Sequence, residues 1–285
     1  MRLILRTFAV LVCLFFFPAG IAFAQQPSAT HPQAFPKVTI AGSEVRMLKS
    51  TATGRDNDLY IHLPSNYTQE TAKKYPVLYI LDGQWDFKLM DSVLGGLVYD
   101  KFVPEMILVG ITYSGENPDY DGLRAMDYTP AATPQVKGSG NGPKFLKFLK
   151  TELIPFIEAN YRADSSHRVL QGSSYAGLFT LYAMFAEPEL FSAYLAASPA
   201  VPYGDRYAFK QEAEYAQTHK ELPVRLFLAV GGAEGLTNPV KEFMQTLQSR
   251  AYKGLKLETR VIEGERHAGN KPETFNRGLR FLFSD

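Results

Sequence analysis

The chain has 285 residues, of which 46% are hydrophobic, and a formal net charge of +1. A chain of this length and apolar content can bury a sizeable core, as one large domain or as two small ones. The balanced charge offers no basic excess for binding nucleic acid and no acidic block of the kind that forms a solvated tail.

The first residues have the pattern of a cleavable export signal. Arg2 and Arg6 precede an apolar run over residues 8–17, and Ala22-Phe23-Ala24 fits a small-x-small cleavage site. We therefore expect a signal peptide over residues 1–24 and a mature protein that is periplasmic or secreted. The apolar run is short for a membrane span, so we expect no stable membrane insertion.

After the signal, residues 25–36 are rich in Gln, Pro, Ser and Ala and predict a flexible tether. A single domain is expected over residues 37–285. The only cysteine of the chain is Cys13, and cleavage of the signal would remove it. The mature protein is therefore expected to have no disulfide, no thiol nucleophile and no cysteine-based metal site.

Buried apolar strands alternate with amphipathic helices along this domain. The apolar runs predict strands over residues 38–40, 43–47, 58–63, 76–81, 106–111, 191–197, 224–230 and 255–262, and a short strand that ends near residue 170. Helical spacing predicts helices over residues 87–99, 143–161, 175–185, 238–251 and 272–283, and a partly helical stretch over 203–222. This order predicts a single α/β domain, with a doubly wound and mostly parallel sheet that follows an N-terminal antiparallel meander.

The segment Gly172-Ser173-Ser174-Tyr175-Ala176 lies where a strand passes through a sharp turn into a helix. That order is the context of a nucleophile elbow, and it places Ser174 at the apex of the turn. Gly172 is expected because a side chain there would collide with the neighbouring helix or strand. Ala176 stands where the full pattern has glycine. A lone Gly-x-Ser is usually a plain turn, so the prediction depends on finding a base, an acid and an oxyanion hole elsewhere.

A serine hydroxyl needs a base within hydrogen-bond reach in order to attack at neutral pH. His267 follows the last predicted strand directly, in a loop of small residues, at the edge of the sheet where such sites form. We select it by elimination. His31 lies in the tether and His62 within an early strand, whereas His167 lies at the amino end of the elbow strand and His219 in a polar helical stretch.

The acid that orients the base is expected after another strand. Glu234 follows the penultimate strand and gives the chain order Ser, acid, His that this type of fold uses. Asp205 is the alternative, because it comes after the strand that follows the elbow. Glu265 is disfavoured, since it is too close to His267 in the sequence.

Two backbone N–H groups are needed to stabilise the oxyanion. Elbow geometry supplies the N–H of Tyr175, and the loop at Gly83-Gln84, after the strand over 76–81, supplies that of Gln84. The chain has no His-Glu-x-x-His motif and no close histidine and cysteine cluster, so we expect no metal. The glycine-rich stretch over 138–142 lacks the lysine of a phosphate-binding loop, and we expect no cofactor.

Taken together, these residues resemble the putative esterase family of α/β-hydrolases. The resemblance covers nearly all of the mature chain and is closest to the enterochelin (siderophore) esterase-like branch. It rests on residues 77–83, Arg124 with Asp127-Tyr128-Thr129-Pro130, residues 153–157 before Tyr161, residues 171–178, residues 191–199 and His267.

The resemblance implies an α/β-hydrolase fold, a Ser174, Glu234 and His267 triad, and an oxyanion hole from the backbone of Gln84 and Tyr175. The family also includes feruloyl and acetylxylan esterases, S-formylglutathione hydrolases and mycolyltransferases. Family membership therefore implies the fold more strongly than the substrate.

These expectations describe an exported serine hydrolase that cleaves a small-molecule carboxylic ester through an acyl-enzyme. The long polar segment over residues 112–142 is expected to be functional. Its Arg124 and Tyr128, together with Trp85, would line a cleft compatible with phenolic or catecholate esters. An acyltransferase with the same triad and a non-catalytic binding module are the alternatives. The sequence indicates no particular oligomeric state.

Overall fold

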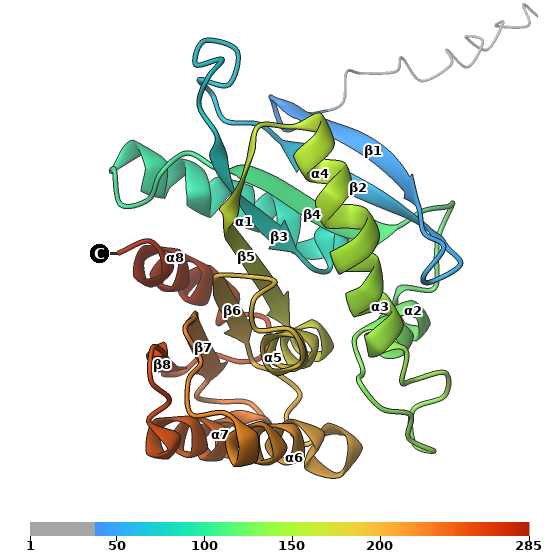
Figure 1. Ribbon diagram of the computed structural model, residues 1–285, viewed down its shortest axis with the longest axis vertical. Coiled ribbons are helices and arrows are strands. Elements are labelled where there is room, and N and C mark those ends of the chain that lie inside the picture. Colours follow the sequence, from blue (N-terminus) through green and yellow to red (C-terminus); the bar gives the residue numbers. More distant parts are fainter. Residues whose placement is uncertain (1–37, 285) are drawn as a thin grey trace, which may run out of the picture. The chain divides into compact units, whose positions relative to one another are not determined.

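Eight strands form one sheet in the computed structural model, which describes residues 38–284 (Figure 1). The strands are β1 (Ser43–Lys49), β2 (Asp56–His62), β3 (Tyr75–Ile80), β4 (Ile107–Tyr113), β5 (Ala163–Ser173), β6 (Ala193–Ala197), β7 (Arg225–Gly231) and β8 (Lys256–Ile262). The signal peptide expected over residues 1–24 and the tether expected over 25–36 lie outside the described residues.

The order of the strands in the sheet is β1-β2-β4-β3-β5-β6-β7-β8. The first two strands are antiparallel, since β1 pairs with β2 and β2 pairs with β4 in that sense. All later pairings, from β4 through β3 to β8, are parallel. The sheet therefore confirms the predicted fold class, a mostly parallel α/β sheet of the α/β-hydrolase type with an antiparallel start.

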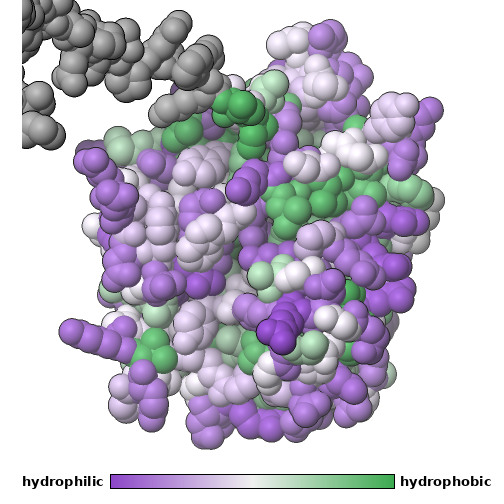
Figure 2. Space-filling model, turned by 180° about the vertical axis from the view of Figure 1, so that it is seen from behind, coloured by the Kyte–Doolittle hydropathy of each residue, from purple (hydrophilic) through white to green (hydrophobic). Residues whose placement is uncertain are grey.

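Helices cover both faces of the sheet, as parallel strands joined by helical crossovers require. On one face, α1 (Gly83–Tyr99) and α8 (Lys271–Leu282) bury Phe87, Met90, Phe275 and Leu279 against the strands. On the other face lie α3 (Gly142–Phe148), α4 (Ile154–Asn160), α5 (Tyr175–Ala186), α6 (Tyr203–Thr218) and α7 (Thr237–Arg250). In the view of Figure 2, polar side chains cover most of the surface, and apolar ones form small patches.

Two local expectations were wrong. Residues 38–40 form no strand. The single helix expected over 143–161 is divided by a π-helical segment, η1 (Leu149–Leu153), which ends next to Pro155. Proline lacks the N–H that a continuous α-helix would use at that position. The segment over 112–142 contains α2 (Tyr120–Asp127), whose start was signalled by Asp119, a capping side chain that accepts the Gly122 N–H at 3.1 Å.

The parallel arrangement brings the carboxyl ends of β3, β5, β6, β7 and β8 to one edge of the sheet. The loops at this edge carry the side chains singled out above: Asp82, Ser174, Glu234 and His267. This edge is where ligands bind in open α/β sheets. Within the described part of the chain, no helix is both long and apolar enough to cross a membrane.

Candidate active site

Ser174 occupies a strained turn between β5 and α5. Its backbone has φ 62° and ψ −119°, a region that residues with a side chain rarely adopt. Two backbone hydrogen bonds hold the turn against the end of β6: the Ser174 N–H donates to the Ala197 carbonyl at 3.0 Å, and the Ala200 N–H donates to the Ser174 carbonyl at 3.0 Å. These bonds hold Ser174, which is partly exposed, at the apex of an elbow.

The glycine of the elbow is required by a close backbone approach. A Cβ atom on residue 172 would lie 2.2 Å from the carbonyl oxygen of Ala176, far inside van der Waals contact. Ala176 itself is fully buried, so the site accommodates the methyl group that replaces the glycine of the full motif. The next residue, Gly177, makes the other close approach, since a Cβ there would lie 3.0 Å from the Ala197 carbonyl oxygen.

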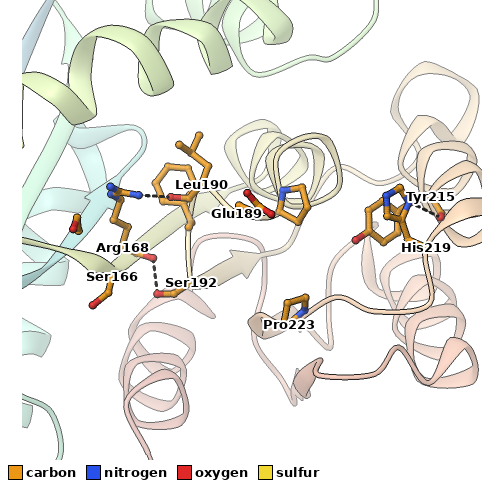
Figure 3. A pocket seen from close by; sticks show the side chains of 11 residues that line it. Ser166, Arg168, Glu189, Leu190, Ser192, Tyr215, His219 and Pro223 are labelled. Carbon is orange, nitrogen blue, oxygen red and sulfur yellow. Dashed lines mark hydrogen bonds between the residues drawn. The ribbon is translucent and has the colours of Figure 1, made fainter.

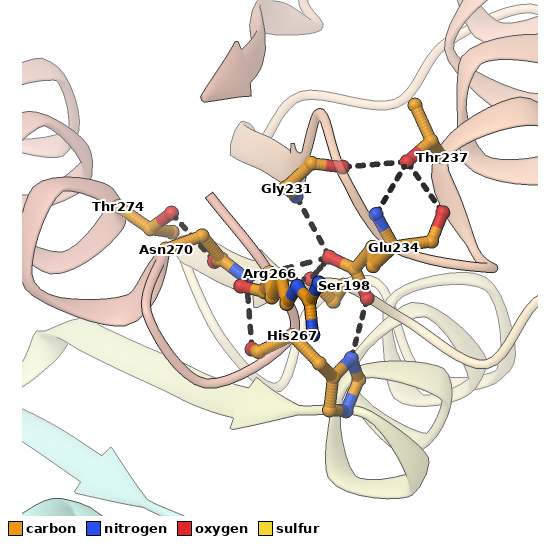
Figure 4. A network of polar contacts seen from close by, with 8 residues as sticks. All are labelled: Ser198, Gly231, Glu234, Thr237, Arg266, His267, Asn270 and Thr274. Carbon is orange, nitrogen blue, oxygen red and sulfur yellow. Dashed lines mark hydrogen bonds and ion pairs between the residues drawn. The ribbon is translucent and has the colours of Figure 1, made fainter. Parts of the chain in front are cut away.

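His267 and Glu234 are in direct contact. The Nδ1 atom of His267 lies 2.5 Å from Oε2 of Glu234 (Figure 4). The Glu234 side chain is only 5% exposed, whereas that of His267 is 44% exposed. A buried carboxylate thus holds one ring nitrogen and leaves the rest of the ring at the surface, as a general base requires.

The second oxygen of Glu234 is held by a network that the sequence did not reveal. Oε1 accepts hydrogen bonds from the Gly231 N–H at 2.7 Å and from the Ser198 hydroxyl at 2.6 Å. Asn270 donates from Nδ2 to Ser198 Oγ at 2.9 Å and to the carbonyl oxygen of His267 at 2.8 Å. Both Ser198 and Asn270 are buried, and Figure 4 shows Ser198 close to Glu234 and Asn270 at the start of the helix that follows the base. The network fixes both carboxylate oxygens in place.

Ser198 also links this network to the nucleophile turn. It follows β6 directly and has a positive φ of 43°, and its N–H donates to the Ala229 carbonyl at 2.7 Å. Its neighbour Ala197 accepts the Ser174 N–H. Ser174 and His267 therefore belong to loops that contact a common segment. The Ser174 hydroxyl has no hydrogen-bond partner in the described chain. This is compatible with a catalytic role, because catalytic hydrogen bonds are often long in ligand-free enzymes.

The alternative acid does not contact this network. Asp205 lies in a left-handed turn at the start of α6, with φ 54°, and its side chain is 89% exposed. It pairs with Lys210 at 2.5 Å on the same helix. Asp205 is thus an ordinary surface charge, and Glu234 is the carboxylate that the structure places against His267.

The other described histidines have partners away from the elbow. His62 pairs with Asp91, and His167 lies 2.7 Å from Asp164 in the polar first half of β5. His219 stacks on the ring of Tyr215 with a centroid distance of 4.2 Å. His31 lies outside the described residues.

The two expected oxyanion donors lie in the first turns of helices that follow neighbouring strands. Strands β3 and β5 pair with each other, and beyond the last paired residues the Leu81 N–H donates to the Gln171 carbonyl at 3.0 Å. The loop after β3 therefore lies beside the elbow. Gln84 and Tyr175 stand in the first turns of α1 and α5, where N–H groups have no partner within the helix. Neither N–H has an acceptor among the described residues. Both are free to bind an anion.

Asp82 fixes the loop before Gln84. Its buried carboxylate receives two hydrogen bonds from Arg124, at 2.6 and 2.9 Å. Burial raises the pKa of the Asp82 carboxyl to about 6, and the facing Arg124 guanidinium opposes that rise. The Tyr128 hydroxyl, itself buried, accepts the N–H of Asp82 at 3.3 Å. Arg124 and Tyr128 therefore support the loop from beneath.

Trp85 is the most exposed of the side chains expected to bind substrate, at 43%. The guanidinium of Arg124 lies 5.0 Å from its ring centroid, and Tyr120 of α2 lies 5.8 Å from it. These contacts hold the indole, which directly follows Gln84 in the chain, with part of its surface facing solvent. Tyr128, which was expected to line the cleft, is enclosed and contributes no exposed surface here.

A cavity of about 450 Å³ lies elsewhere in the molecule (Figure 3). Its lining comes from the amino-terminal part of β5, from the loop before β6 and from the end of α6, and includes Ser166, Arg168, Leu190, Ser192, Tyr215 and His219. This is the edge of the sheet opposite to Ser174, so the cavity is separate from the candidate active site. Among residues 38–284, no group of three or more His, Cys, Asp or Glu side chains is placed to hold a metal ion.

The chain is similar to known esterases. The sequence profile of the family described as "Putative esterase" matches residues 50–277. The ferri-bacillibactin esterase BesA of Bacillus subtilis (strain 168) is 28% identical over 263 residues, which are 85% of this chain and 90% of that protein.

Two solved structures have the same fold. An IroE-like serine hydrolase from Shewanella oneidensis is 28% identical and superposes with a TM-score of 0.75, over 85% of this chain and 80% of that one. The BES protein from Bacillus cereus is 24% identical and superposes with a TM-score of 0.79, over 90% of this chain and 100% of that one.

Proposed function

The chain belongs to the putative esterase family and is therefore a carboxylic ester hydrolase, and we propose that it cleaves siderophore-type esters with Ser174, His267 and Glu234. The observation that carries this assignment is the contact between His267 and the buried Glu234, at the same sheet edge as the strained Ser174 turn. A nucleophile, a base and an orienting acid are the groups that ester cleavage requires.

In the first step, Ser174 Oγ attacks the ester carbonyl carbon while His267 Nε2 takes the hydroxyl proton. Glu234 accepts the Nδ1–H hydrogen bond, which keeps Nε2 free to act as a base and stabilises the imidazolium that forms. The negative charge on the carbonyl oxygen is met by the N–H groups of Gln84 and Tyr175. The tetrahedral intermediate then breaks its bond to the alcohol oxygen, which leaves with the proton from His267.

In the second step, water replaces the alcohol. His267 takes a proton from the water as its oxygen attacks the acyl carbon, and the same two N–H groups bind the new oxyanion. Collapse of this intermediate breaks the bond to Ser174 Oγ, which recovers the proton. The products are one alcohol and one acid for each water consumed, and the enzyme is regenerated.

Two observations support siderophore-type esters as the substrate class. The relative BesA is described as a ferri-bacillibactin esterase, and its similarity spans 85% of this chain. The aromatic surface beside the oxyanion donors, formed by Trp85 and Tyr120, suits the flat rings of catecholate groups.

An ester panel tests this proposal. We expect the protein from residue 25 onward to hydrolyse a catecholate trilactone with a higher kcat/KM than p-nitrophenyl acetate, p-nitrophenyl octanoate or methyl ferulate. A fluorophosphonate should label the wild type and not Ser174→Ala. If the Ser174→Ala variant hydrolyses each ester as fast as the wild type does, the serine hydrolase assignment is wrong. It is also wrong if neither protein hydrolyses any of the esters. A preference for methyl ferulate would reject only the siderophore class.

Export is a separate part of the proposal, supported by the sequence pattern of residues 1–24 alone. Expression of the full chain in a bacterium should yield an exported protein whose intact mass matches a start at Gln25. Recovery of the uncleaved chain from the cytoplasm would contradict it. A variant with Ala22 and Ala24 changed to leucine should block cleavage, because signal cleavage needs small residues there.

A further inference from the structure

A buried ion pair joins two helices that begin at the candidate active site. The Nζ atom of Lys271, in the first turn of α8, lies 2.7 Å from Oδ1 of Asp86, in the first turn of α1. The Asp86 side chain is 2% exposed and that of Lys271 is 19% exposed. The two residues are 185 positions apart in the sequence, so the pair is a purely tertiary contact.

Asp86 contacts three elements that contain or adjoin proposed catalytic groups. It lies two residues after Gln84 on α1, and its N–H donates to the Asp82 carbonyl at 3.0 Å. Gln171, three residues before Ser174 on β5, directs Nε2 toward Oδ2 of Asp86 at 3.4 Å. Lys271 lies four residues after His267. One carboxylate thus meets the helix of the oxyanion donor, the strand of the nucleophile and the helix that follows the base.

Stability alone is a poor explanation for a pair of this kind. Removing two charges from water is costly, and replacing a buried pair with neutral side chains is often neutral or stabilising. A buried pair can instead fix one arrangement of the elements that it joins. The opposite side of the start of α1 is already fixed, because Gly83 packs on the backbone of β4. A Cβ atom on residue 83 would lie 2.8 Å from the carbonyl carbon of Gly110.

We propose that Lys271 and Asp86 are positioning residues that set the Gln84 N–H of the oxyanion hole relative to Ser174 and His267. This inference rests on the proposed function. Without the pair, the start of α1 keeps its packing on β4 and the bonds of Asp82 to Arg124 and Tyr128, but it loses its link to α8. The N–H group then shifts from the place where the oxyanion forms. A misplacement of about 1 Å can lower a rate by about 10²-fold. Substrate binding away from the reacting carbonyl is unaffected.

The test compares Lys271→Met, Asp86→Asn and the double variant with the wild type, using the best ester of the panel. We expect kcat to fall by about 10- to 100-fold with KM within about twofold, since only the transition state uses the oxyanion donors. The affinity for a boronic acid that forms a tetrahedral adduct with Ser174 should fall by the same factor as kcat/KM. Lys253→Met, which removes an exposed pair with Glu221, is the matched control and should leave both values unchanged.

The double variant separates positioning from stability. Lys271→Met alone leaves Asp86 buried without its partner, and a lowered melting temperature is expected for it. The double variant has no unpaired charge, so it should melt close to the wild type and still show the lowered kcat. A folded double variant with wild-type kcat and wild-type boronate affinity would overturn the inference. Failure of the wild type to hydrolyse any ester would reject the proposed function instead.

Discussion

Replacing Ser174 with alanine is expected to lower kcat by about 10⁴- to 10⁶-fold, the scale seen when a catalytic serine is removed. The hydroxyl oxygen is the atom that forms the acyl-enzyme, and the other serine of the elbow, Ser173, is buried. The turn itself should persist, since it is held by the backbone bonds of residues 174, 197 and 200. Steady-state kinetics, with circular dichroism to establish folding, would measure the effect.

Ser173→Ala is the matched control for this experiment. Ser173 is the adjacent serine, it is buried, and its hydroxyl has no partner within the described chain. Losing an unpartnered buried hydroxyl should not destabilise the fold, and kcat should stay within about threefold, since Ser173 takes no part in the proposed chemistry. If Ser174→Ala kept more than a few per cent of the activity, the nucleophile would have to be sought elsewhere.

Replacing Glu234 with glutamine is expected to lower kcat by about 10²- to 10⁴-fold, less than the loss of the nucleophile. Oε1 accepts hydrogen bonds from the Gly231 N–H and the Ser198 hydroxyl, so the amide oxygen of glutamine must take that place. The amide NH₂ then faces His267 Nδ1. Nδ1 must accept a hydrogen bond, which puts the ring proton on Nε2 and removes the base that Ser174 needs.

The control for Glu234 is Asp205→Asn, which changes an exposed carboxylate paired with Lys210. Its kcat should stay within about twofold of the wild type, since exposed pairs contribute little. A larger loss in Asp205→Asn than in Glu234→Gln would reject the assignment of the acid. Both variants should be assayed over a range of pH, so that a shifted profile is not mistaken for a loss of activity.

Much of the fold could be predicted from the sequence because several central strands are continuous apolar runs. The runs at 76–81 and 224–230 correspond to β3 and β7 within one or two residues, and the strand expected over 255–262 corresponds to β8. Parallel strands share one carboxyl edge, so the positions of Glu234 and His267 after two adjacent strands predict their proximity. Their contact at 2.5 Å is the geometry that this reasoning requires, while their catalytic roles stay predictions.

The supporting residues could not be predicted in the same way. Asp86 and Lys271 lie in the first turns of amphipathic helices, where a charge usually faces water, and nothing in the sequence indicates that the two meet. Ser198 and Asn270 are common residues after a strand and before a helix. Their contacts depend on how loops far apart in the sequence pack together, which strand and helix periodicity does not determine.

The segment between β4 and α3 bears on how enzymes of this design diversify. None of the proposed triad residues lies in it, and only Arg124 and Tyr128 bond to the oxyanion loop, through Asp82. Tyr120, by contrast, packs on the exposed ring of Trp85. Selection for a new ester can therefore act on Tyr120 and the loop around it while the reaction is inherited unchanged, and Arg124 and Tyr128 are the two positions at which such a lineage has the least freedom to vary.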